Sequence, residues 1–80
     1  MNTKQAVAKR IRELCVERGI AINTLANLSG VTPSTVYSIL SEKSQNPGIV
    51  TLKILCDGLG ISLQNFFDTK LFDELEQEVK

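Results

Sequence analysis

Glycine and proline residues divide this sequence into a series of short segments. These residues are Gly19, Gly30, Pro33, Pro47, Gly48, Gly58 and Gly60. Between them, apolar residues recur every three or four positions, the spacing that places them on one face of a helix. No segment alternates apolar and polar residues for long enough to form a strand. The sequence therefore predicts an all-α fold of five or six short helices.

The apolar stripes place these helices. We expect a first amphipathic helix over about 3–18, ended by Gly19, and a two-turn helix over 23–29 with Leu25 and Leu28 facing inward. Thr32 and Pro33 form a helix start, a capping hydroxyl followed by a residue whose missing N–H would be unpaired there anyway.

Three further segments follow the polar loop at 41–48. A helix carries Leu52, Leu55, Cys56 and Leu59 and is ended by the pair Gly58 and Gly60, and Ser62 caps a short helix that buries Phe66 and Phe67. The last stripe predicts an acidic C-terminal helix, through Leu71, Phe72, Leu75 and Val79.

Composition narrows the function classes. An apolar fraction of 42% and a charged fraction of 22% are typical of a folded, soluble domain. No apolar run approaches the roughly 18 residues of a membrane span, and no signal-peptide pattern opens the chain, so we expect a cytoplasmic protein. Without histidine, with no nucleophile–base pair and with Cys15 and Cys56 outside any CxxC pair, the sequence predicts no enzyme, cofactor, metal site or small-molecule ligand. Both cysteines are expected to be small buried hydrophobic residues.

Charge is distributed unevenly along a chain whose net charge is zero. Residues 1–67 hold seven basic and four acidic side chains, a net charge of +3, and residues 68–80 hold two basic and five acidic ones, a net charge of −3. We interpret Lys9, Arg10, Arg12 and Arg18 as a solvated helix face interleaved with glutamates rather than as a phosphate clamp. The C-terminal tail is thus opposite in charge to the rest of the chain.

Residues 22–41 have the layout of a helix-turn-helix, two short helices joined by a glycine turn. Ala26 stands where two helices approach closely, and Gly30 can take the positive φ that the turn needs. Val36 and Ile39 hold the second helix on the core, and Val31 fills the space beneath the turn.

Residues 11–67 resemble the Cro/repressor-like helix-turn-helix family of the xenobiotic-response-element (XRE) type. The matching stretches are Ile11-Arg12-Glu13-Leu14, Leu25-Ala26, Gly30-Val31-Thr32, Ser34-Thr35-Val36, Ile39, Asn46-Pro47, Thr51-Leu52 and Leu59-Gly60-Ile61-Ser62-Leu63. The resemblance implies a five-helix, lambda-repressor-like bundle over residues 1–67. It also implies sequence-specific binding of double-stranded DNA by a small bacterial or phage transcriptional regulator, acting as a homodimer on a roughly twofold-symmetric site.

The family places the helix from Thr32 to Ser41 in the major groove of DNA. The resemblance thus implies that this helix presents hydroxyls and one aromatic ring, Ser34, Thr35, Tyr37, Ser38 and Ser41, to bases and phosphates. Asn23 at the start of the preceding helix, Thr32, and the loop residues Lys43, Ser44 and Gln45 would meet the DNA backbone. Tyr37 could instead be a half-buried surface aromatic.

The chain departs from the family pattern at three places. Ile22 stands where the family commonly has Gln, Glu42 stands where it often has Gly, and the recognition helix has no Arg, Lys, Asn or Gln. An acid at 42 would be unfavourable against phosphate unless it points away. An alternative function is a helix-turn-helix that binds protein, for example an antitoxin-like partner. In either case, we expect the acidic helix at 68–80 to pack on its own domain or on a twin subunit.

Overall fold

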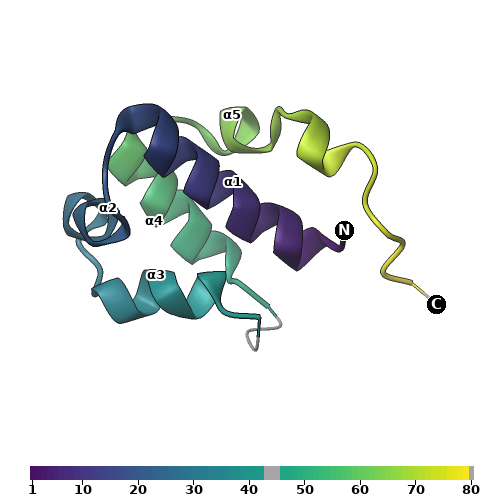
Figure 1. The fold of residues 1–80 in the computed structure, drawn as a ribbon, viewed down its shortest axis with the longest axis horizontal. Coiled ribbons are helices and arrows are strands. Elements are labelled where there is room, and N and C mark those ends of the chain that lie inside the picture. The colour runs from purple at the N-terminus through teal and green to yellow at the C-terminus, as the bar shows by residue number, and fades with distance from the viewer. Residues whose placement is uncertain (43–45, 80) are drawn as a thin grey trace.

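The computed structural model describes residues 1–42 and 46–79, and within them the chain is entirely helical apart from turns and loops. Its elements are α1 (Thr3–Arg18), α2 (Ile22–Ser29), α3 (Pro33–Leu40), α4 (Ile49–Leu59), α5 (Leu63–Phe67) and a 3₁₀ turn, η1 (Lys70–Phe72). Figure 1 shows α1 running across the molecule, with α2 and α3 along one side and α5 on the other. The all-α prediction is confirmed.

The helix ends follow local chemistry. At the start of α1, the Asn2 side chain accepts from the Gln5 N–H at 2.8 Å, while the Gln5 side chain accepts from the Asn2 N–H at 2.9 Å, a complete capping box. Helices α1, α2 and α4 end at Gly19, Gly30 and Gly60, whose φ values of 65°, 69° and 71° are left-handed. Glycine adopts this conformation without the steric cost that a Cβ imposes.

One apolar core joins all five helices. Its largest fully buried side chains are Phe66, Ile11, Leu25, Leu55, Val36 and Cys56. Phe67 and Phe72 extend this core toward η1, with the two ring centroids 5.0 Å apart and edge to face. Ala26 is completely buried, as its predicted place at a close helix approach requires.

Two predicted positions differ in the structure. Leu28 is 57% exposed rather than inward, because the eight-residue α2 buries only Leu25 and Ala26. Gly58 does not end its helix, because α4 continues through it to Leu59 and stops at Gly60. Instead, Gly58 allows α2 to approach: a Cβ built on it would lie 2.2 Å from the Ser29 Oγ and 3.0 Å from the Ser29 Cα.

The predicted acidic C-terminal helix is absent. After η1 the described chain, through residue 79, forms turns and extended backbone. A helix there would place Glu74 and Glu78 four residues apart, where like charges repel. The extended chain instead lies against α1: the Glu76 N–H donates to the Met1 carbonyl at 3.3 Å and the Glu76 carboxylate lies 3.6 Å from the N-terminal ammonium. Glu78 accepts from the Thr3 hydroxyl at 3.0 Å.

We predict that Gly58→Ala destabilises the protein. Alanine in a helix interior gains about 1 kcal/mol over glycine, but overpacking against the Ser29 backbone costs about 1–3 kcal/mol or more. The contact distances of 2.2 and 3.0 Å indicate that overpacking wins. Chemical denaturation should show a free energy of unfolding lower by about 1–2 kcal/mol.

Ser29→Ala provides the matched control. The Ser29 hydroxyl is buried and has no hydrogen-bond partner among the described residues, so its removal should be neutral or slightly stabilising. Combined with Gly58→Ala, it should recover part of the lost stability because the closest contact is gone. Strictly additive losses in the double variant would show that Ser29 is not what Gly58 accommodates.

Candidate nucleic-acid interface

The recognition helix α3 separates an apolar face from a polar one. Its buried side chains are Val36, Ile39 and Leu40. Ser34, Ser38 and Tyr37 point to solvent, Tyr37 with 51% of its surface exposed. The three-to-four residue spacing of the apolar positions fixes this division, so the predicted reading face is free of the core.

The start of α3 carries a small hydroxyl network. The Thr32 hydroxyl lies 3.0 Å from the hydroxyls of both Ser34 and Thr35. Thr32 holds the N-cap position, as predicted, but its hydroxyl makes no capping bond to the helix backbone. The expected capping role of this side chain is therefore wrong. Its oxygen lies instead among the other hydroxyls of the first turn.

A shallow groove of about 510 Å³ lies between α3 and the start of α4. Three of the predicted contact residues, Ser34, Thr35 and Ser38, line it together with Asn46 and Thr51. Thr51 was not among the predicted site residues, since its only signal was membership of a matching stretch of sequence. The groove is polar and open, a shape suited to a backbone or a base edge rather than to an enclosed small molecule.

The remaining predicted site residues lie outside this groove. Asn23 is exposed on the first turn of α2. Thr32, at the N-cap of α3, and Tyr37, within α3, are also exposed. Ser41 is half-buried at the C-terminal end of α3. The predicted contacts at Lys43, Ser44 and Gln45 lie outside the described residues.

Two of the four basic side chains of α1 that were predicted to form a solvated face, Arg10 and Arg18, instead donate hydrogen bonds to other helices. The Arg10 guanidinium donates to the carbonyls of Phe66 at 2.7 Å and Asn65 at 2.9 Å, at the end of α5. The Arg18 guanidinium donates to the Leu59 carbonyl at the end of α4. A cation at a helix C-terminus is attracted by the partial negative charge of the unpaired carbonyls. These two arginines therefore join helices together.

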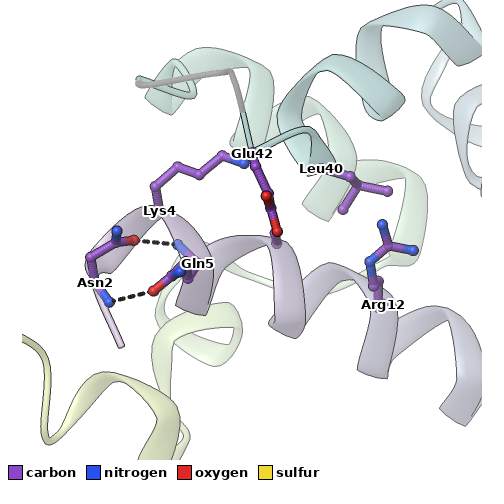
Figure 2. Close-up of a pocket in the computed structure, with 7 residues that line it drawn as sticks. Asn2, Lys4, Gln5, Arg12, Leu40 and Glu42 are labelled. Atoms are coloured by element: carbon purple, nitrogen blue, oxygen red, sulfur yellow. Dashed lines mark hydrogen bonds between the residues drawn. The ribbon is translucent and has the colours of Figure 1, made fainter.

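Glu42 also has a defined environment. Together with Lys4, Gln5, Arg12 and Leu40 it lines a cavity of about 410 Å³ between α1 and the end of α3. Figure 2 shows its carboxylate pointing down toward α1. The acid at this position is therefore turned toward α1.

Both cysteines are buried and reduced. Cys15 is 4% exposed and Cys56 is fully buried, as predicted. Burial raises the pKa of each thiol above its ordinary value, against the smaller opposite effect of Arg12 at Cys15. Among the described residues, no three His, Cys, Asp or Glu side chains gather into a possible metal site. No helix in the same ranges is long and apolar enough to cross a membrane.

The geometry is that of a helix-turn-helix DNA-binding domain, and comparison with known proteins agrees. Residues 10–70 match the family model of the Cro/C1-type helix-turn-helix DNA-binding domain, so the chain belongs to this family, which is defined by DNA binding and not by catalysis. It is 37% identical over 62 residues to the HTH-type transcriptional regulator PuuR of Escherichia coli K12 and to that of Shigella flexneri. That match covers 78% of this chain but only 33% of the regulators.

Solved structures give the same fold. The prophage Lp1 protein 11 superposes with a TM-score of 0.81 at 34% identity, over 94% of this chain and 100% of that one. A point mutant of the restriction-modification controller protein C.Esp1396I superposes with a TM-score of 0.74 at 25% identity, over 91% and 92% of the two chains. The five-helix, all-α architecture is thus common to this chain and both of these proteins.

We predict that neither thiol reacts in the folded protein. Burial favours the neutral form, so labelling by a thiol-specific disulfide reagent at neutral pH should occur only through unfolding. Because folding raises both pKa values, the neutral thiols contribute stability that is fully present below the ordinary value of 9.0 and is lost as the pH rises through the raised values. The free energy of unfolding should fall above pH 9.

The control is a Cys15→Ala, Cys56→Ala double variant. It should lose the part of the alkaline fall that comes from the thiols. Rapid labelling of the wild type without denaturant would contradict the burial of these residues.

Proposed function

We propose that this chain is a sequence-specific DNA-binding transcriptional regulator that inserts α3 into the major groove. The observation that carries the proposal is the hydroxyl-lined groove between α3 and α4, beside a recognition helix whose polar face is exposed. Membership of the family and the similarity to named regulators and a controller protein support it. We place its action in the cytoplasm, where bacterial DNA lies.

Reading by this helix depends on many modest contacts. Ser34, Thr35 and Ser38 can each exchange a neutral hydrogen bond with a base edge or phosphate, worth about 0.5–1.5 kcal/mol. The exposed Tyr37 can pack on a thymine methyl or reach a phosphate. With no long side chain to form a bidentate pair, the shape of the groove contributes a share of the specificity.

Backbone contacts fix the register of the complex. We assign them to Asn23 on α2, to Thr32 and Ser41 at the two ends of α3, and to the loop residues Lys43, Ser44 and Gln45. Such contacts carry affinity rather than sequence information.

Selection from random-sequence DNA, followed by binding measurements on the selected site, tests the proposal. Ser34→Glu and Ser38→Glu should each reduce binding by more than a hundredfold, because a carboxylate would face the base edges and phosphates of the major groove. Both positions are on the surface of α3, so circular dichroism should show folded variants. Fluorescence anisotropy gives the affinities.

Gln64→Glu is the matched control. It adds the same charge on an exposed position of α5, away from α3 (Figure 1), and should leave binding within about twofold at moderate salt. Folded glutamate variants that bind as tightly as wild type would exclude α3 as the reader. A protein partner of the antitoxin type would then become the leading function.

We further propose that the regulator binds as a homodimer through the start of α4. Ile49 and Val50 are adjacent apolar residues with 56% and 70% of their surface exposed, next to the groove that α3 borders. Two copies that meet there would bring their α3 helices to the same side of the pair, as a twofold site with half-sites about 34 Å apart requires. Shielding this apolar surface from water favours the association.

Val50→Lys should yield a monomer at concentrations where the wild type sediments as a dimer. It should also weaken binding to a twofold site, because the second half-site no longer adds to the affinity. Val16→Lys is the matched control, because Val16 is 81% exposed but lies on another helix, near the C-terminal end of α1. It should leave the dimer intact. A wild type that sediments as a monomer, both free and on DNA, would refute the dimer.

A further inference from the structure

The end of α3 is built differently from the ends of α1, α2 and α4. Those helices stop at glycines of positive φ, whose N–H groups close the last turn. Helix α3 stops at Ser41, with an extended φ of −70° and ψ of 137°, and the Ser41 N–H donates to the Tyr37 carbonyl at 2.9 Å. No glycine closes this turn, so α3 lacks the left-handed cap that ends those three helices.

A side chain from a distant helix reaches this end. The Lys4 ammonium, on the first turn of α1, donates a hydrogen bond to the Ser41 carbonyl, 37 residues along the chain. Lys4 is half-buried, and it lines the cavity between α1 and α3 with Leu40 and Glu42. In Figure 2 its stem rises from α1 and its ammonium lies at the beginning of the segment that follows α3.

The position of this contact decides its role. On its apolar side α3 is held by Ile39 and Leu40, which are 5% and 7% exposed, so the last turn cannot slide along the core. The carbonyls at a helix C-terminus carry partial negative charge, and the Lys4 cation is attracted to them. What Lys4 adds is a tether on Ser41, the predicted DNA contact at the C-terminal end of α3.

We propose that Lys4 is a positioning residue for DNA recognition, which acts on the exit of α3 and not on DNA. The inference rests on the proposed function. An ammonium that is bonded to a main-chain carbonyl is already engaged in the free protein. Its removal therefore changes the shape of the reading surface rather than the number of phosphates that the protein neutralises.

Salt dependence separates these two roles. A lysine that contacts phosphate contributes about 0.9 to the slope of log K against log salt, and a positioning residue contributes nothing. Lys4→Met, which keeps the stem and removes the charge, should weaken binding to the selected DNA about tenfold with the slope unchanged. Lys4→Arg should restore most of the affinity. Lys9→Met removes the same charge from an exposed position of α1 and should change affinity less than twofold.

A measurement without DNA tests the contact itself. Amide hydrogen exchange at Ser41 should accelerate in Lys4→Met, while exchange in α5 stays at the wild-type rate. Unchanged exchange together with unchanged DNA affinity would overturn the proposal, and so would a slope reduced by about 0.9 per subunit. Failure of the wild type to select any DNA sequence would instead overturn the proposed function. The two failures are therefore distinguishable.

Discussion

The structure depends on one long helix that serves two surfaces. The apolar stripe of α1 supplies Val7, Ile11 and Leu14 to the core. Its basic side chains reach outward to the carbonyl ends of three other helices: Lys4 to α3, Arg10 to α5 and Arg18 to α4. Each such contact satisfies carbonyl groups that a helix end leaves unpaired. A domain of 80 residues buries a limited apolar surface, so these polar contacts carry a real share of its stability.

Local features of the fold were predictable from sequence because their causes are local. The positive φ of Gly30, the burial of Ala26 and the division of α3 into two faces follow from residue type and a spacing of three to four. The exposed hydroxyls of the candidate interface were predictable for the same reason. The predicted contact residues Ser34 and Ser38 do lie together in one groove.

The remaining features are set by residues far apart in the chain. No pattern in the sequence shows that Gly58 faces Ser29, or that Arg10 and Arg18 donate to carbonyls 41 or more residues away. The acceptors are main-chain carbonyls, and because every residue has one, residue type does not reveal which carbonyl accepts the bond. In the acidic tail, a local pattern is misleading. The spacing of Leu71 and Leu75 is helical, but a helix would bring like-charged carboxylates together. In the structure, Glu76 and Glu78 instead contact Met1 and Thr3 at the N-terminus.

The placement of individual acids, rather than the net charge of zero, bears on a nucleic-acid interface. Glu76 and Glu78 are held at the N-terminal end of α1 by Met1 and Thr3, and the Glu42 carboxylate is turned toward α1. Surface fields decay over about 8–10 Å at physiological salt, and α3 itself carries no acidic side chain. What the exposed face of α3 presents to a polyanion is therefore its own hydroxyls. Total charge is a poor guide to binding in a chain that pairs some of its acids internally, as at Asp57, Glu76 and Glu78.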